Sequence, residues 1–192
     1  MKALALCFAV LATPAALATN QQSVIATYAA TAFTQYSSAL EGARSLQAAI
    51  ETFLADPNEA NLTEARQAWL KAREAYSPTE IYRFYSGPID DQDGPEGLIN
   101  AWPLDEAYID YVQGDNTAGI IQQPDLYPDL TSEVLASLNE KDGETNIATG
   151  YHAIEFLLWG QDLSATGPGN RPASDYVTAP FAQRRKEYLR LS

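Results

Sequence analysis

Apolar residues along this chain recur at steps of three and four, the spacing of one face of an α-helix, and no run shows the clean alternation expected of a β-strand. Residues 24–54 form the longest such stretch, which is rich in alanine and contains no proline. It ends at Asp56-Pro57-Asn58, and a second helical pattern covers residues 60–76. The pattern therefore predicts an all-α fold.

Shorter helices separated by long loops follow these two. Ser77-Pro78-Thr79-Glu80 resembles a capping box with proline at the first helical position, and it predicts a short helix to about Tyr85. Further helices are predicted over residues 103–111, 131–139, 146–159 (closed by Gly160) and 180–191, and loops over residues 87–97, 113–129 and 163–174. We expect an up-and-down helical bundle with long loops. Because the last helix stops without a cap, we also expect a chain truncated at its C-terminus.

The N-terminus has the features of a Sec-type signal peptide. Lys2 supplies a positive n-region, residues 3–11 an apolar h-region, and Ala16-Leu17-Ala18 an A-x-A cleavage site. The apolar run is too short for a transmembrane helix, and no later stretch is apolar enough to be one. We therefore predict a leader over residues 1–18 and one helical domain over residues 19–192, exported to the periplasm or outer envelope of a bacterium without a transmembrane segment in the mature chain.

The composition of the chain excludes several classes of function. The chain has 25 Asp and Glu against 12 Lys and Arg, a formal net charge of −13. This balance argues against nucleic-acid binding, which depends on clustered basic residues, and is compatible with cation binding. A single cysteine and a single histidine exclude disulfide scaffolds, Cys-rich zinc sites and HExxH metalloprotease sites.

The histidine is the first candidate for chemistry. His152 and Glu155 are three apart on one predicted helix, and such a pair can supply an imidazole and a carboxylate to a metal. The alternative is a hydrogen-bonded pair that serves packing. Gly150, inside the same predicted helix, costs about 1 kcal/mol relative to alanine, which is tolerable where another helix or a ligand must approach closely.

Acidic residues concentrate between positions 80 and 110, and oxygen ligands at this density suit hard cations. The stretch contains one basic residue, Arg83. Its acidic residues are Glu80, Asp90, Asp91, Asp93, Glu96, Asp105, Glu106 and Asp110. A solvated acidic loop is the alternative for Asp91, Asp93 and Glu96. Glu80 has a second interpretation as the acidic member of the capping box. Asp105 either supports the site or favours the N-terminus of the helix predicted after Pro103.

Arg73, Tyr76 and Arg83 follow helical spacing beside these acids. Such side chains orient metal-binding carboxylates by hydrogen bonds in many proteins. The alternative is that they belong to the core and its rim.

Three ordered blocks together resemble the imelysin family, which includes the insulin-cleaving membrane protease and the iron-regulated protein A group. GYHAIEFLLWGQDLS carries the family's G-x-H-x-x-E signature in Gly150, His152 and Glu155. WLKAREAYSPTEIYRFYSGPID resembles the first conserved block and AWPLDEAYIDY the second, and the tail RRKEYL resembles the start of the next helix. The similarity covers most of residues 24–190.

The resemblance implies an all-helical fold that the family builds from two related bundle halves, of which this chain matches the first. It also implies a metal site at His152 and Glu155, and in the iron-uptake relatives carboxylates near the first block complete it. Glu80 and Asp90 are the positions that match best.

One histidine with several carboxylates suits iron or calcium better than catalytic zinc. We therefore expect metal binding, iron first with calcium or zinc as alternatives, in iron acquisition at the cell envelope together with other uptake components. One alternative is a metallopeptidase, in keeping with the family's peptidase label, with Glu155 as base or ligand. The other is a non-catalytic helical interaction module in which the His–Glu pair only packs.

Overall fold

The computed structural model describes residues 20–192, so the predicted leader lies outside the described residues. The all-α prediction is confirmed: helices dominate, and within this range the extended backbone amounts to an isolated bridge between Val112 and Asp115. The α-helices are α1 (Gln21–Ala55), α2 (Glu59–Tyr76), α3 (Glu96–Asn100), α4 (Glu106–Ile109), α5 (Ser132–Leu138), α6 (Gly150–Trp159) and α7 (Ala182–Leu191). The 3₁₀ helices are η1 (Ser77–Tyr82), η2 (Ile120–Gln122) and η3 (Ala173–Tyr176).

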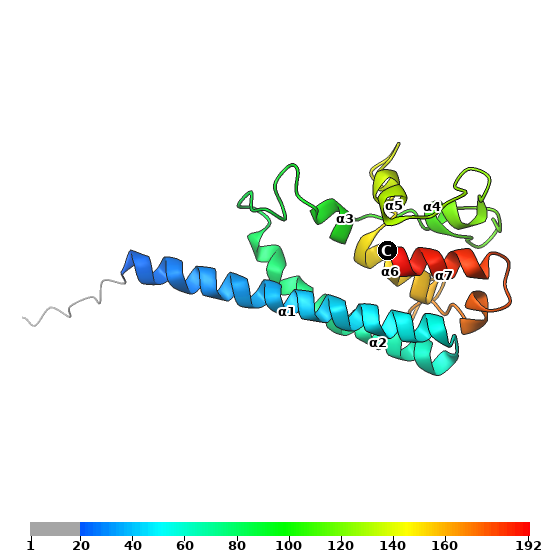
Figure 1. Cartoon of the computed structure of the whole chain (residues 1–192), viewed down its shortest axis with the longest axis horizontal. Helices are drawn as coiled ribbons and strands as arrows, with labels where there is room; N and C mark the ends of the chain where they lie inside the picture. Colours follow the sequence, from blue (N-terminus) through cyan, green and yellow to red (C-terminus); the bar gives the residue numbers. More distant parts are fainter. Residues whose placement is uncertain (1–19) are drawn as a thin grey trace, which may run out of the picture.

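Helices α1 and α2 form a long antiparallel pair along one side of the molecule (Figure 1). Asn20 caps α1 by accepting a hydrogen bond from the Gln22 amide, and Asn58 caps α2 by accepting one from the Asn61 amide. The turn between the two helices is only Asp56-Pro57-Asn58, which forces the chain to reverse at once. Together the two helices contribute the buried residues Ile50, Phe53, Leu62, Ala65, Trp69 and Ala72 to the core.

The shorter helices α6 and α7 pack across this pair, α6 against α2 and α7 against α1. Helix α6 is buried on most of its surface, and the Trp69 indole N–H of α2 donates a hydrogen bond of 2.8 Å to its Tyr151 carbonyl. The Tyr188 hydroxyl of α7 donates to the Ala148 carbonyl just before α6. These contacts fix the helix that carries the G-x-H-x-x-E residues.

A buried ionic cluster ties the second conserved block to the end of the chain. Asp110 is fully buried, and its carboxylate accepts hydrogen bonds from Arg171 (2.6 Å), from Arg185 (2.6 and 3.0 Å) and from Gln122 (2.6 Å). Both arginines are also buried. Buried charges are tolerated only when they are paired and hydrogen-bonded, so this cluster fixes how these segments meet.

Several predicted helix boundaries are wrong. The short helix predicted from Ser77 to about Tyr85 is the 3₁₀ helix η1, which follows α2 directly and ends at Tyr82. The Ser77 hydroxyl donates to the Arg73 carbonyl instead of forming the capping box. Helix α3 begins at Glu96, within the region predicted as a loop over residues 87–97. The helix predicted over residues 103–111 is only the single turn α4.

Helix α6 begins four residues later than predicted. Gly150 is its first residue and has a left-handed φ of +87°, so it lies at the start of the helix rather than inside it. The Asn139 side chain accepts hydrogen bonds from the Ala148 and Thr149 amides, which holds the preceding segment extended. A Cβ on Gly150 would lie 2.4 Å from the Ile99 carbonyl oxygen of α3. The predicted close approach of another helix therefore occurs here.

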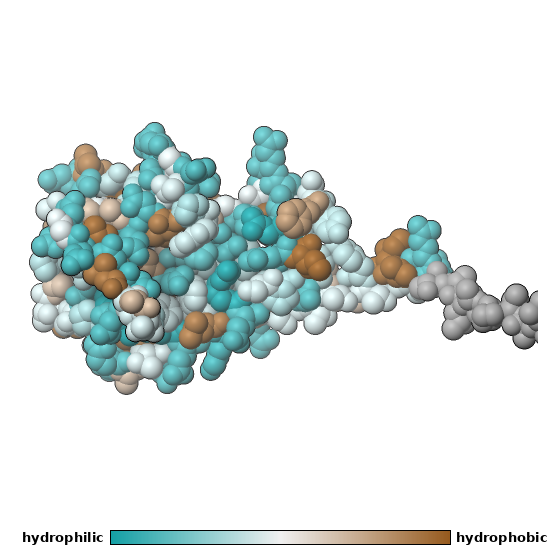
Figure 2. All heavy atoms as spheres, turned by 180° about the vertical axis from the view of Figure 1, so that it is seen from behind, coloured by the Kyte–Doolittle hydropathy of each residue, from teal (hydrophilic) through white to brown (hydrophobic). Residues whose placement is uncertain are grey.

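The N-terminal end of α1 extends beyond the rest of the described chain (Figure 1), and apolar side chains stand out along this end (Figure 2). Val24, Ile25, Tyr28 and Phe33 are each at least half exposed, and Ala39 is the first residue of α1 that is buried. Between residues 20 and 192, no helix combines the length and apolar character needed to cross a membrane.

Candidate metal centre

His152 and Glu155 lie side by side on α6, as their spacing predicts. Nδ1 of His152 is 3.2 Å from Oε2 of Glu155, and the two side chains are 17% and 43% exposed. Hydrogen bonding to a carboxylate fixes both the tautomer and the orientation of an imidazole, and leaves Nε2 free to bind a metal. Within residues 20–192, Nδ1 is the ring nitrogen for which a hydrogen-bond partner is present.

Trp102 covers the imidazole and was not among the predicted site residues. The two ring centroids are 4.8 Å apart with the planes inclined at 52°. Trp102 lies directly before Pro103 at the start of the second conserved block, yet a lone tryptophan gives no signal that it stacks on a histidine 50 residues away. His152 and Trp102 together line two hollows.

The first, which we call the polar hollow, has a volume of about 580 Å³ and brings His152 and Glu80 together. Its other polar lining residues are Arg73, Arg83, Glu96, Asn100 and Glu140. Of these, Glu96, Asn100 and Glu140 were not predicted as site residues. Glu140 follows α5 and reaches the site only through the fold, so no local pattern could have indicated it.

Glu80 is held by two neighbours. Its Oε1 is 3.6 Å from the Arg73 guanidinium and 3.3 Å from the amide nitrogen of Asn100, and Arg73 also donates to the Asn100 side-chain oxygen at 2.8 Å. The Arg73 guanidinium lies over the rings of Tyr76 and Tyr151, 5.4 and 5.2 Å from their centroids. Arg73 is thus placed to orient a carboxylate.

Arg83 pairs with Glu96 rather than with Glu80. The two groups are 2.9 Å apart, and the Glu96 side chain is only 17% exposed. Glu96, grouped with the acidic loop in the sequence, therefore lies largely within the polar hollow. Burial, followed by the charge of Glu96, raises the pKa of Tyr76 to about 12, so this hydroxyl stays protonated at neutral pH.

Asp90 and Asp105 lie apart from the polar hollow. Asp90 is in the turn after Gly87, does not line the hollow, and helps to raise the pKa of Tyr36 after the larger effect of burial. Asp105 is the N-cap of α4 and accepts a hydrogen bond from the Ala107 amide at 3.0 Å. Its interpretation as a residue that favours a helix N-terminus is therefore correct, although that helix begins after Asp105 and not after Pro103.

Across residues 20–192, no group of three or more His, Cys, Asp or Glu side chains is already arranged to hold a metal ion. The site consists of the His152–Glu155 pair and of three carboxylates in the polar hollow. Arg73 pairs with Glu80 and Arg83 with Glu96. A metal held by either of these carboxylates would compete with its arginine.

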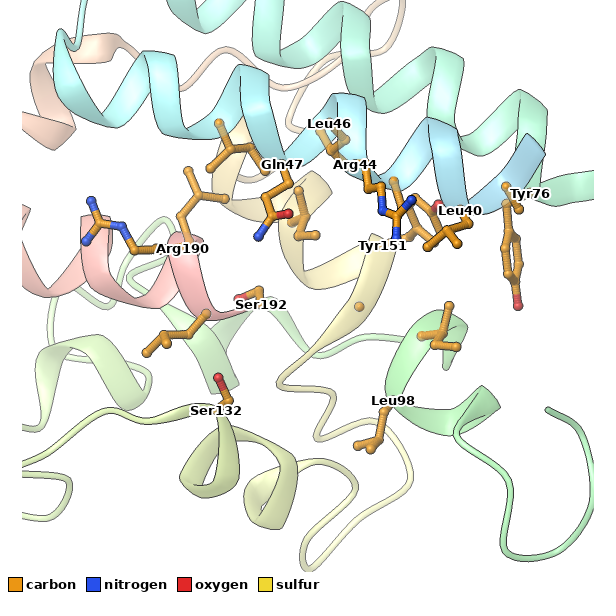
Figure 3. Close-up of a pocket in the computed structure, with 18 of the residues that line it drawn as sticks. Leu40, Arg44, Leu46, Gln47, Tyr76, Leu98, Ser132, Tyr151, Arg190 and Ser192 are labelled. Atoms are coloured by element: carbon orange, nitrogen blue, oxygen red, sulfur yellow. The ribbon is translucent and has the colours of Figure 1, made fainter. Parts of the chain in front are cut away.

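A larger hollow on a different face of α6 is chemically unlike the site. It has a volume of about 790 Å³, lies between α1 and the helices α3, α6 and α7, and is mainly apolar (Figure 3). Tyr76 and Tyr151 line it, and its carboxylate, Glu51, lies 3.3 Å from Arg190. It contains no histidine, so it does not compete with the polar hollow as a metal site.

Comparison with known proteins identifies the family of this chain. The family model for imelysin matches residues 32–192, which include α2, the polar hollow and α6. The chain belongs to the imelysin family. Iron-regulated protein A of Synechococcus elongatus is a relative that is 35% identical over 124 residues. The aligned part covers 65% of this imelysin-family chain and 27% of that relative, so the chain matches about a quarter of the relative's length.

Proposed function

We propose that this chain binds a metal cation as cargo, iron in the first place, in iron acquisition at the cell envelope. Membership of the imelysin family and the relative called iron-regulated protein A support an iron-related role. The signal-peptide pattern of residues 1–18 supports export to the periplasm or outer envelope, where other components of an uptake system would be the partners.

The observation that carries the proposal is the place of His152. Glu155 orients the His152 imidazole through Nδ1. His152 also lines the polar hollow together with Glu80, Glu96 and Glu140. An imidazole with several carboxylate oxygens is a donor set that suits iron and suits catalytic zinc less well. We propose His152 and Glu80 as ligands and Glu155 either as a further ligand or as the partner that orients His152.

Iron binding tests the proposal directly. Mature protein is stripped with a chelator, dialysed against ferric citrate and analysed for bound metal. We expect His152→Ala to abolish iron binding, and Glu155→Gln to weaken it about 10- to 100-fold, the usual effect of losing the partner of a ligating histidine. Glu80→Gln should weaken binding as well.

Two carboxylates serve as controls. Asp90→Asn removes an acid that the sequence favours as a ligand but that lies outside the polar hollow, and Glu144→Gln removes an exposed acid that lines none of the hollows described above. Both variants should bind iron like the wild type. Equal iron binding by wild type and His152→Ala, with both proteins folded by circular dichroism, would contradict the proposal. Tighter binding of calcium or zinc than of iron would reassign the cargo.

A metallopeptidase is the competing function. Catalytic zinc requires three protein ligands and an open water position, and one imidazole with several carboxylates suits iron better than catalytic zinc. Chelator-sensitive cleavage of an unfolded protein, lost in Glu155→Gln, would overturn the preference for cargo binding.

A further inference from the structure

The second hollow, which Glu155 lines together with His152, gathers all three tryptophans of the chain. This tryptophan hollow has a volume of about 750 Å³ and is lined by Trp69 of α2, Trp102 before α4 and Trp159 at the end of α6. Trp69 and Trp159 meet edge to face with their centroids 5.4 Å apart. Aromatic side chains from three distant parts of the sequence thus converge on one hollow.

Trp102 is the ring that remains open to a ligand. Trp69 is only 7% exposed, and the guanidinium of Arg66 already lies 5.7 Å from the centroid of Trp159. Trp102 is 68% exposed although one side of it contacts His152. A large aromatic side chain left exposed beside a hollow is characteristic of a binding surface.

The same hollow is negatively charged and has no internal counter-charge. Asp105, Glu106, Glu155 and Asp162 line it, whereas no lysine or arginine does. In the described part of the chain, none of the four carboxylates forms an ion pair with a lysine or arginine. This contrasts with the polar hollow, where arginines pair with Glu80 and Glu96. Burial also raises the pKa of Glu106, as expected of a carboxylate that lacks a cationic partner.

The walls of the tryptophan hollow are held in place by the scaffold. Arg66 donates hydrogen bonds to the carbonyls of Leu158 and Arg171, which join the end of α6 to the loop that follows it. Gly169 approaches Trp159 so closely that a Cβ there would lie 2.6 Å from the Trp159 carbonyl oxygen. A site that is ordered before binding loses less entropy when a ligand enters.

We propose that the tryptophan hollow binds an organic cation of the alkylated ammonium type. Such a cation is weakly hydrated, so it gains both from the face of an indole and from nearby carboxylates. A small, strongly hydrated metal ion keeps its water shell and gains little from an indole face. His152 and Glu155 line this hollow as well, but the test is separate from iron binding because it changes Trp102 and Glu106, which are not proposed iron ligands.

Choline and its neutral carbon analogue, 3,3-dimethylbutan-1-ol, form a matched pair of probes that differ in charge but hardly in shape. We would titrate chelator-treated mature protein with each by isothermal calorimetry, so that the result is separate from iron binding. We expect choline to bind at least about tenfold more tightly than the alcohol. Trp102→Ala and Glu106→Gln should each weaken choline binding about five- to thirtyfold, the range for loss of a partly desolvated cation–π or charge contact.

Matched controls keep the test specific. Phe84→Ala removes an aromatic residue that is 88% exposed outside the hollow, and Glu144→Gln removes an exposed acid elsewhere, so both should bind choline as the wild type does. Thermal melts would confirm that all variants fold. The proposal is overturned if choline does not bind, if it binds no better than the alcohol, or if Trp102→Ala and Glu106→Gln both retain wild-type affinity.

Discussion

At the scale of single residues, Asp110 shows how a buried charge organises this protein. Burial by itself would raise the pKa of Asp110, but the hydrogen bond from Arg185 and the charges of Arg171 and Arg185 hold it below its usual value. The carboxylate therefore stays ionised in the core at neutral pH. Asp110 belongs to the second conserved block, but its role is to join that block to the segments that contain Arg171 and Arg185, and no metal chemistry is needed to explain it.

Replacing Asp110 by asparagine should destabilise the fold strongly. Asp110→Asn leaves the buried Arg185 guanidinium without a carboxylate and Arg171 with only Asp175, at 3.4 Å. Breaking a buried ion pair typically costs about 3–5 kcal/mol. Urea unfolding at pH 7 measures this loss, with the exposed Asp125→Asn as a control that should change stability little. A loss below about 1 kcal/mol would mean that the cluster contributes little beyond packing.

The same carboxylate predicts a dependence of stability on pH. Because its pKa in the folded state lies below the unfolded value of about 3.9, its contribution is complete above that value and is lost as the pH falls through the folded pKa. The free energy of unfolding should therefore decline below about pH 4. Asp110→Asn should show a shallower decline in the same titration, and a curve parallel to that of the wild type would contradict the assignment.

At the scale of elements, the start of α6 shows where local pattern and tertiary contact differ. The apolar stripe of residues 146–159 fits one helix, yet the helix begins only at Gly150 because Asn139 holds the preceding amides and the chain turns through a left-handed φ. The Ile99 carbonyl then packs against Gly150. This contact brings the end of α3, including Asn100, to the site. The glycine of the signature is thus explained by close packing.

Gly150→Ala should cost more stability than its backbone angle alone explains. Gly114 has a nearly identical φ of +88°, but a Cβ there would meet nothing within 4 Å, whereas at Gly150 a Cβ would meet backbone at 2.4 Å. Both alanine variants carry the strain of a left-handed residue, about 1–3 kcal/mol. Gly150→Ala should lose a further 1–3 kcal/mol or so to overpacking. Equal losses in thermal or urea unfolding would show that α3 can move aside.

At the scale of the whole molecule, stability is distributed unevenly along α1. Its second half packs on α2 and contributes Leu46, Ile50 and Phe53 to the core, while residues 21–38 include no buried side chain. An isolated helix is only marginally stable in water, and most helix stability in proteins comes from packing of an apolar face. The extended end of α1 (Figure 1) should therefore open far more often than the rest of the same helix.

Hydrogen exchange tests this difference within one helix. Backbone amides of residues 21–38 should exchange at least about tenfold faster than those of residues 46–55, because they can open without disturbing the core. Exchange followed by mass spectrometry on peptides from each half measures the two rates. Equal protection would imply that something covers the exposed apolar side chains, and light scattering would show whether that is a second copy of the chain.

Part of the structure followed from the sequence because it depends on neighbouring residues alone. The long helices α1 and α2, the turn between them, the pairing of His152 with Glu155 and the end of α6 at Gly160 are set by periodicity, capping residues and glycine. The acidic balance and the content of one histidine and one cysteine likewise limited the possible chemistry. The imelysin signature identified the family before any contact was known.

Tertiary structure decided which distant residues share a site. Glu140 and Glu96 join Glu80 and His152 in the polar hollow, while Asp90 remains outside it. Three tryptophans converge on a second hollow that His152 also lines. No local pattern encodes these meetings, because they depend on how α2, α3 and α6 pack and on the buried charges that hold the loops. Helices and turns depend on residues close together in the sequence, whereas the residues that make up a site depend on how distant segments pack.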